Sequence, residues 1–145
     1  MSAFKDQLLA GKTAFIAGGT SGINLGIARR FAELGARVAV AGRNPEKAAN
    51  AAALIGGGAL GFSCDVRDYA ATRTALEGTA KQFGLLDIVV SGAAGNFVAP
   101  VVGLSANGFR TVVDIDLNGT FNVFRGSHEL LRTPGTGCCK RSVSG

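Results

Sequence analysis

A glycine-rich turn between a short apolar run and a helical stretch constrains this sequence more than any other feature. The turn, Ala17-Gly-Gly-Thr-Ser-Gly-Ile-Asn-Leu-Gly26, follows a buried-strand pattern over 12–17 and leads into a helical pattern over 23–34. Glycines at such a junction let the backbone approach a pyrophosphate, whose charge is met by amides at the positive end of the helix. The strand and helix on either side favour a nucleotide-binding unit over an ordinary flexible turn.

Strand-like and helical segments continue to alternate, which is the pattern of a parallel sheet covered by helices. On the first predicted helix, Ile23, Ile27, Phe31 and Leu34 share one apolar face. We expect an α/β fold, an incomplete doubly wound (Rossmann) parallel sheet with strand order 3-2-1-4 and helices on both faces. The predicted strands are 12–17, 37–41, 59–64 and 86–91, and the predicted helices are 23–34, 45–55, 69–83 and about 105–131.

The pattern changes at Pro134. A strand should follow the last helix, but residues 134–145 have almost no β-branched apolar content. We therefore expect one domain over residues 1–133 and an aberrant or disordered tail over 134–145. Because four strands leave one edge of the sheet unfinished, the favoured explanation is a larger domain cut short here.

Composition and charge exclude several classes of protein. Of the net charge of +5, three positive charges (Arg132, Lys140 and Arg141) lie in the last fourteen residues without an acidic neighbour. Interspersed signs elsewhere, no tryptophan and one tyrosine argue against a nucleic-acid partner. The three cysteines fit neither a disulfide framework nor a metal site. The uncharged stretch 88–109 contains Pro100 and four glycines, which argues against a membrane span, and no secretory signal opens the chain.

The end of the second predicted strand indicates which cofactor is bound. An NAD site needs a carboxylate there to accept from the ribose 2′-hydroxyl. Gly42 offers none, and Arg43 would attract a 2′-phosphate through charge-assisted hydrogen bonds. The sequence therefore predicts NADP(H), the alternative being that Arg43 is a solvated loop charge.

Asp116 is the candidate for proton transfer. It lies three and four residues from Val112, Val113, Gly119 and Thr120, which places it on an apolar or small-residue face of the last predicted helix. Burial of a carboxylate is costly unless it is paired, and it raises the pKa, which suits proton transfer. The alternative is a carboxylate paired with a neighbouring arginine.

Taken together, these segments resemble the short-chain dehydrogenase/reductase family. Its motif Thr-Gly-x-x-x-Gly-x-Gly matches at Gly18 and Gly22, whereas Ala17 replaces the threonine and Asn24 the third glycine. Ser91-Gly-Ala-Ala-Gly95 resembles the family's Asn-Asn-Ala-Gly segment with both asparagines replaced. Most of the family has a catalytic asparagine where this chain has Asp116. Aspartate there, with Ala93-Ala-Gly-Asn-Phe97 upstream, is similar to the peroxisomal-type 2,4-dienoyl-coenzyme A reductases, over about residues 9–131.

The resemblance implies roles for three sets of residues. The catalytic residue would be Asp116. Asp65 would accept from the adenine amino group, unless it caps the next helix instead, and Val66 would pack on the ring. Phe97 would line the acyl substrate unless it is a core residue, and Ser105 would do so unless it is only a helix cap. The full cofactor set is Gly18, Ser21, Gly22, Ile23, Arg43, Asp65, Val66, Ala93, Ala94 and Gly95, and the substrate set is Arg67, Phe97, Ser105, Ala106 and Asn107.

The resemblance further implies an NADPH-dependent oxidoreductase that acts on an acyl thioester of coenzyme A in fatty-acid β-oxidation and is a homo-oligomer when intact. Its compartment would be the cytoplasm, or the peroxisome in a eukaryote. The family's catalytic tyrosine and lysine have no counterpart, because Tyr69 lies too early and Lys140 lies in the tail. We therefore expect this chain to be inactive by itself. The alternatives are another short-chain reductase, acting on a ketoacyl or enoyl thioester or an alcohol, and a non-catalytic nucleotide-binding module.

Overall fold

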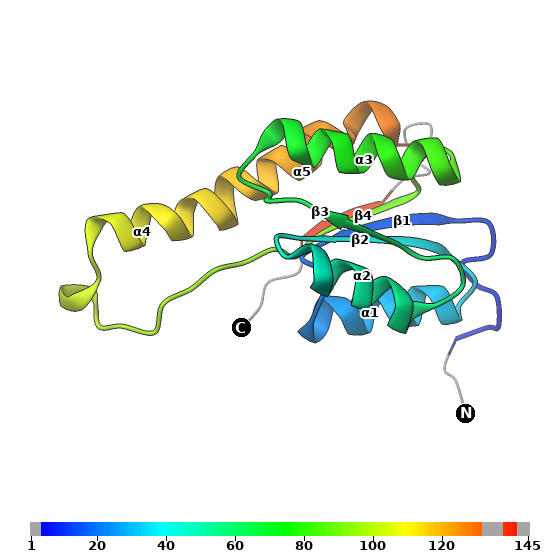
Figure 1. Ribbon diagram of the computed structural model, residues 1–145, viewed down its shortest axis with the longest axis horizontal. Coiled ribbons are helices and arrows are strands. Elements are labelled where there is room, and N and C mark those ends of the chain that lie inside the picture. Colours follow the sequence, from blue (N-terminus) through cyan, green and yellow to red (C-terminus); the bar gives the residue numbers. More distant parts are fainter. Residues whose placement is uncertain (1–3, 132–137, 142–145) are drawn as a thin grey trace.

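A parallel five-stranded sheet forms the centre of the molecule, with the strand order β3-β2-β1-β4-β5 (Figure 1). The computed structural model describes residues 4–131 and 138–141. The order 3-2-1-4 that the sequence predicts is confirmed, and a fifth strand lies outside β4. The strands are β1 (Thr13–Ala17), β2 (Arg37–Gly42), β3 (Leu60–Ser63), β4 (Ile88–Ser91) and β5 (Cys138–Arg141).

Helices cover both faces of the sheet (Figure 1). On one face lie α1 (Gly22–Glu33) and α2 (Pro45–Ile55), and on the other lie α3 (Tyr69–Phe83) and α5 (Gly119–Ser127). The remaining elements are η1 (Val101–Gly103), α4 (Ala106–Val113), a π-helical turn η2 (Asp114–Asn118) and η3 (His128–Leu130). Within the described ranges, no helix is long and apolar enough to span a bilayer.

The core has two layers because successive side chains of a strand point to opposite faces of the sheet. Phe15 of β1 packs on the side of α3 and α5 with Leu76 and Val123. The next residue, Ile16, packs on the side of α1 and α2 with Ala28. Every residue of β1 is buried, as expected for the middle strand of a doubly wound sheet.

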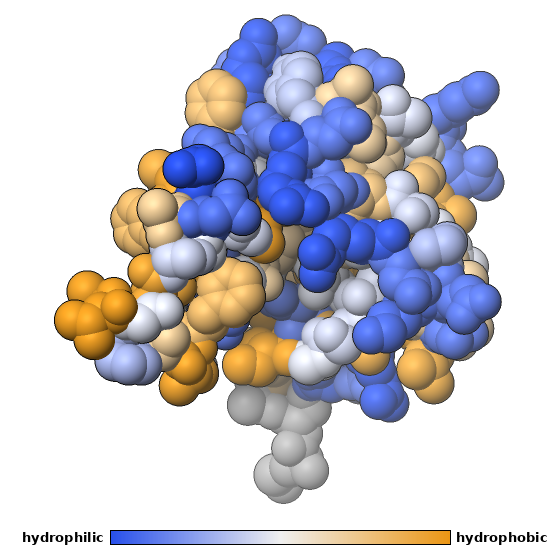
Figure 2. Space-filling model, turned by 60° about the vertical axis from the view of Figure 1, so that its left-hand side comes forward, coloured by the Kyte–Doolittle hydropathy of each residue, from blue (hydrophilic) through white to orange (hydrophobic). Residues whose placement is uncertain are grey.

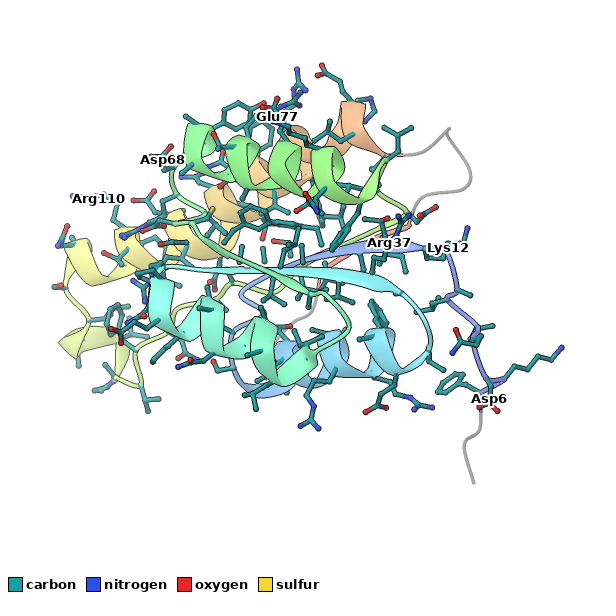
Figure 3. All side chains as sticks on the ribbon, turned by 45° about the vertical axis from the view of Figure 1, so that its right-hand side comes forward. Asp6, Lys12, Arg37, Asp68, Glu77 and Arg110 are labelled. Carbon is teal, nitrogen blue, oxygen red and sulfur yellow. The ribbon has the colours of Figure 1, made fainter. Side chains whose placement is uncertain are left out.

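At the amino ends of the strands, a buried carboxylate ties β1 to β4. Asp87 is 2% exposed, accepts from the Thr13 N–H at 2.9 Å, and pairs with Lys12 at 3.5 Å. Lys12 and Arg37 lie at this edge, across the molecule from Asp68 and Arg110 (Figure 3). The amino ends of the strands therefore carry a structural contact, and the carboxyl ends are free to hold a ligand.

Two helix predictions need correction. Ile23 is 70% exposed, so it does not belong to the apolar face of α1, because the first turn of that helix projects past the core at the carboxyl end of the sheet. The single helix predicted over about 105–131 is interrupted by the π-helical turn Asp114–Asn118 between α4 and α5. A π turn accommodates an additional residue per turn, which shifts the faces of the helix on either side of it.

The prediction of a tail without a strand is wrong for Cys138–Arg141. These residues pair in parallel with β4, Ile88 opposite Cys138 and Ser91 opposite Arg141. A ladder is built by backbone groups, and the open edge of β4 offers unpaired N–H and C=O groups to any returning segment. β-Branched side chains are therefore not required there. The rest of the predicted tail, 134–137 and 142–145, lies outside the described residues.

Candidate functional site

A cavity of about 860 Å³ opens where β1, β2, β3 and β4 end. Carboxyl ends of parallel strands meet at one edge of a sheet, and the connections reverse direction beside β1, which is where ligands bind in such folds. The cavity is lined by all the residues predicted to contact a cofactor except Gly95, namely Gly18, Ser21, Gly22, Ile23, Arg43, Asp65, Val66, Ala93 and Ala94.

The turn from β1 to α1 has the geometry of a phosphate cradle. Gly18 and Gly22 have φ of 74° and 58°, in the left-handed region that favours glycine. A Cβ at Gly18 would lie 2.6 Å from the Ala93 nitrogen, so this glycine permits close packing against the segment after β4. At Gly22 a Cβ would meet nothing within 4 Å, so space is open in front of the first turn of α1. An anion there would face the positive end of the helix.

At the end of β2 the cavity is basic. Arg43 is exposed at its rim, and Lys47, in the first turn of α2, lines it as well. The side chain of Asn44 caps α2 by accepting from the Lys47 N–H at 3.0 Å. Two cations and a helix amino terminus therefore meet at this junction, which contributes no carboxylate to the cavity lining.

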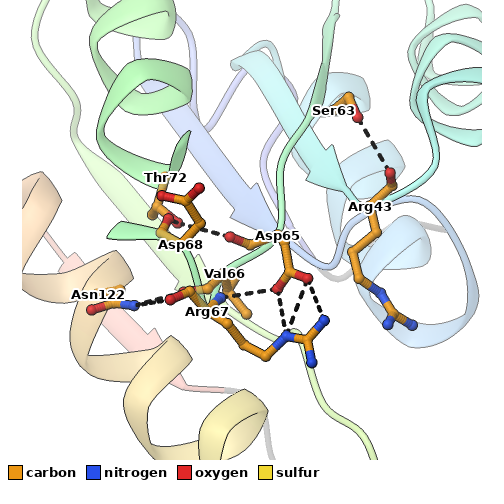
Figure 4. A network of polar contacts seen from close by, with 8 residues as sticks. All are labelled: Arg43, Ser63, Asp65, Val66, Arg67, Asp68, Thr72 and Asn122. Carbon is orange, nitrogen blue, oxygen red and sulfur yellow. Dashed lines mark hydrogen bonds and ion pairs between the residues drawn. The ribbon is translucent and has the colours of Figure 1, made fainter. Parts of the chain in front are cut away.

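After β3, Asp65 and Arg67 form an ion pair that is supported by several hydrogen bonds between them (Figure 4). The Arg67 Nη2 lies 2.6 Å from the Asp65 Oδ2, and the Arg67 Nε and backbone N–H both donate to Oδ1 at 3.0 Å. The Arg67 side chain, by hydrogen bonding, holds the pKa of Asp65 below its usual range, against a smaller opposing effect of desolvation. Asp65 does not cap α3, so that alternative is wrong; Asp68 does, accepting from the Ala71 N–H at 3.0 Å.

The segment after β4 forms the opposite wall. Ala93 and Ala94 line the cavity, and Gly92 beside them is buried. Asn24, the departure from the family's glycine motif, sends its side chain across from α1 and donates to the Gly92 carbonyl at 2.8 Å. Its amide is thus directed at the end of β4, a contact that sequence reasoning did not anticipate.

Asp116 lies behind this wall, in the π-helical turn. Its Oδ1 accepts from the Gly95 N–H at 3.0 Å, and a Cβ at Gly95 would lie 2.7 Å from the Ile115 side chain. The carboxylate is half-buried and does not itself line the cavity, although Ile115 does. The alternative of an arginine partner is not borne out, because no ion pair in the part of the chain that the structure describes includes Asp116.

Of the residues predicted to contact an acyl substrate, Arg67 follows β3 and pairs with Asp65, and the other four lie on an arm, residues 96–109, that projects from the sheet (Figure 1). Phe97 is 56% exposed, so it is not a core residue. Ser105 caps α4 by accepting from the Gly108 N–H at 3.0 Å, and a Cβ at Gly108 would lie 3.9 Å from the Phe97 ring. Phe97 and Ser105 thus both lie close to Gly108, and Phe97, Ser105, Ala106 and Asn107 do not line the cavity.

Sequence reasoning missed several lining residues. Lys47 could have been found, because it lies one turn into a helix that starts beside Arg43. Cys64 could not have been found, because it is a core residue, 5% exposed. Burial raises the pKa of its thiol. The other lining residues not predicted are Thr20, Asn24, Gly42, Asn44, Pro45, Gly92 and Ile115.

The sequence and the fold of this chain are similar to those of known proteins. Residues 12–137 match the short chain dehydrogenase family. The chain is 42% identical over 134 residues to a peroxisomal 2,4-dienoyl-CoA reductase of the (3E)-enoyl-CoA-producing type from Arabidopsis thaliana, an alignment that covers 90% of this chain and 45% of the relative. The chain therefore spans less than half the length of that relative.

Solved structures show the same fold. A citronellol catabolism dehydrogenase from Pseudomonas aeruginosa PAO1 has a TM-score of 0.87 and 31% identity, over 97% of this chain and 59% of that protein. A 3-ketoacyl-(acyl-carrier-protein) reductase from Brucella melitensis, complexed with NADH, has a TM-score of 0.77 and 32% identity, over 81% of this chain and 49% of that protein.

Proposed function

The chain belongs to the short-chain dehydrogenase/reductase family, and we propose that its cavity binds NADP(H) as the cofactor-binding part of a 2,4-dienoyl-coenzyme A reductase. The observation that carries the choice of NADP(H) is the junction after β2, where Arg43 and Lys47 line the cavity and no carboxylate does. A ribose 2′-hydroxyl would lack its acceptor there, whereas a 2′-phosphate would meet two cations.

The residues present fit a dinucleotide. Open space in front of Gly22, at the start of α1, would receive the pyrophosphate, and Val66 would pack against the adenine. Ala93 and Ala94 offer a smooth wall for the nicotinamide ribose. When bound, the cofactor supplies a hydride.

The chain's own contribution to the chemistry centres on Asp116. Its Oδ1 is engaged by the Gly95 N–H, so a proton for the dienoyl thioester would be held at Oδ2. Arg67, which pairs with the lining residue Asp65, is the cation that would meet a phosphate of coenzyme A, and Phe97 with the start of α4 would contact the acyl chain. Names of relatives as 2,4-dienoyl-CoA reductases support this substrate class over ketoacyl thioesters or alcohols.

The setting follows the same relatives. We place the reaction in fatty-acid β-oxidation, in the peroxisome if the organism is a eukaryote and in the cytoplasm otherwise, with a homo-oligomer as the intact form. The peroxisomal names of the relatives support the peroxisome as the compartment in a eukaryote.

Replacement of Arg43 tests the cofactor choice. In calorimetry, the unmodified chain should bind NADPH more tightly than NADH. Arg43→Ala should remove most of that preference, weakening NADPH by about tenfold or more, because a charge-assisted hydrogen bond to the 2′-phosphate is lost. Arg37→Ala is the matched control, since it removes an equal charge from the opposite end of the same strand (Figure 3). Equal affinity of the unmodified chain for the two cofactors would refute the proposal.

Turnover tests the catalytic part. The 145-residue chain should bind NADPH but should not oxidise it with a dienoyl-coenzyme A at an enzyme-like rate. Proton delivery through Asp116 also needs a cofactor fixed beside the substrate, and the family's tyrosine and lysine have no counterpart here. Robust turnover, measured as loss of NADPH absorbance, would contradict this. In a version extended by a region that carries the family's catalytic tyrosine and lysine, a panel of dienoyl, ketoacyl and enoyl thioesters distinguishes the substrate classes.

A further inference from the structure

Two segments far apart in the sequence are joined at the end of β4 by one side chain. The Asn24 Nδ2, on α1, donates to the Gly92 carbonyl at 2.8 Å, and the Gly92 N–H donates to the Ala17 carbonyl at 3.0 Å. The unit of β1, its turn and α1 therefore holds Gly92 through both backbone groups.

Space, rather than backbone conformation, explains the glycine at position 92. Gly92 is not among the glycines with positive φ, so its backbone conformation is open to other residues. A Cβ there, however, would lie 2.3 Å from the Asn24 Oδ1 and 2.4 Å from its Nδ2. Asn24 thus occupies the volume that a side chain at position 92 would need.

The two positions have exchanged side chains relative to the family's motifs. The glycine motif has glycine where this chain has Asn24, and the Asn-Asn-Ala-Gly segment has asparagine where this chain has Gly92. In this chain the amide side chain between α1 and the end of β4 comes from the helix. The packing of one position thereby depends on the other.

This contact serves one half of the cavity only. In the sheet, β2 and β4 lie on opposite sides of β1, so Arg43 and Gly92 lie on opposite sides of the phosphate cradle. A dinucleotide that crosses such a cleft places one nucleoside on each side. The Gly92 side, continuous with Ala93 and Ala94, is the side for the nicotinamide.

We propose that Asn24 is a positioning residue: by holding the Gly92 carbonyl, it fixes the position of the segment Gly92, Ala93 and Ala94, the nicotinamide wall of the cavity. This inference rests on the proposed binding of NADP(H). The wall is already packed without clearance on the β1 side, where a Cβ at Gly18 would lie 2.6 Å from the Ala93 nitrogen. Loss of the Asn24 contact leaves the Gly92 carbonyl without this donor and disturbs the nicotinamide half, while the 2′-phosphate half is untouched.

Calorimetry with two ligands tests the proposal on the full chain. NADPH carries both halves of the cofactor, whereas adenosine 2′,5′-bisphosphate carries only the adenosine half with its 2′-phosphate. Asn24→Gly should weaken NADPH by about tenfold and the bisphosphate by less than about twofold. Asn24→Ala, which removes the amide donor and adds no charge beside the phosphate cradle, should show the same selective loss. It also serves as the second variant if the glycine variant folds poorly.

A double replacement gives the sharper readout. N24G together with G92N restores an amide between the two segments, so NADPH affinity should return to within about threefold of the unmodified chain, while G92N alone should lose it through overlap with Asn24. Asn50→Gly is the control, because it makes the same change at an exposed position of α2 outside the cavity.

Three outcomes would overturn the inference. Equal weakening of both ligands by N24G and N24A would show a merely structural role. Unchanged NADPH affinity in both variants would show that the contact does not position the wall. An unmodified chain that binds neither ligand would refute the proposed function, and this inference with it, whereas the first two outcomes leave NADP(H) binding intact.

Discussion

At the mouth of the cavity, Asp65 and Arg67 satisfy one another through side chain and backbone. Both carboxylate oxygens accept two hydrogen bonds each from Arg67, which fills the usual capacity of an ionised carboxylate. An adenine amino group that approaches Asp65 must therefore share or displace one of these bonds. Asn122 fixes the same turn from α5 by donating to the Val66 carbonyl at 2.8 Å (Figure 4).

The pair makes a prediction about pH. The pKa of Asp65 is lowered by Arg67, so the stability that the pair contributes is fully present above the ordinary aspartate pKa and is lost as the pH falls through the lowered value. Arg67→Ala should raise the Asp65 pKa toward its ordinary range, as measured by carbon NMR of the carboxyl group. The stability difference from the unmodified chain should be constant near neutral pH and shrink in acid.

Because the pair is partly exposed and screened by solvent, the stability difference at neutral pH should be small. Arg110→Ala is a suitable control, since it removes an exposed charge that forms no ion pair with Asp65. A carboxyl pKa of Asp65 that does not move in Arg67→Ala would show that the bond in Figure 4 does not persist in solution.

Residue types at strand ends could be predicted, but their partners could not. The sequence places Asp65, Val66, Ala93 and Ala94 at the correct edge, since parallel strands end together. It does not reveal that Arg67 folds back onto Asp65, nor that Asn24 reaches Gly92, because each contact depends on a rotamer and a distance across the fold.

The π-helical turn Asp114–Asn118 is the element that delivers Asp116 to the wall of the cavity. It lies between two α-helices and directs Asp116 to Gly95 while Asp114 bonds Asn118 at 2.9 Å. π Turns inside helices are frequent at functional sites, which accords with the proposed role of Asp116.

Hydrogen exchange at Gly95 tests this anchoring. Asp116→Ala removes the acceptor, so the Gly95 amide should exchange about fivefold faster, the effect of one hydrogen bond worth about 1 kcal/mol. Asp116→Asn keeps an acceptor oxygen and should leave the rate nearly unchanged. Asp114→Ala, in the same turn, should also leave Gly95 unaffected. Fast exchange at Gly95 in the unmodified chain itself would contradict the contact.

Elements with local signals were predicted well, and elements without them were not. The helix Tyr69–Phe83 was predicted with its observed bounds, since Asp68 caps its start and Gly84, with φ of 88°, ends it. The π turn has no distinct composition, so the sequence predicts one long helix instead. The strand Cys138–Arg141 was missed because its pairing is set by the open edge of β4 and not by its own side chains.

At the scale of the whole molecule, apolar side chains are exposed on two surfaces formed by residues that the structure describes. One is the arm, where Val98, Val101 and Val102 are at least 90% exposed; Figure 2 shows hydrophobic side chains gathered on the side from which the arm projects. The other is a hollow of about 620 Å³ on the outer face of α5, lined by Leu117, Phe121 and Phe124 among others. Surfaces of this kind on a chain of this size mark sites of association.

Self-association of the chain should therefore depend on the hollow on α5. In sedimentation velocity, the unmodified chain should show a sedimentation coefficient that rises with concentration, because contact between chains removes Leu117 and Phe121, each 64% exposed, from water. Replacement of both by serine should shift the chain toward a monomer, with little loss of folding stability because neither side chain is in the core.

Leu54→Ser on α2 is the matched control, since Leu54 is equally exposed at 65% but lies on the other face of the sheet. If Leu54→Ser reduces association as much as the α5 variant does, the contact is general hydrophobic adhesion. A monodisperse monomer of the unmodified chain at all concentrations would mean that the hollow on α5 binds no second copy.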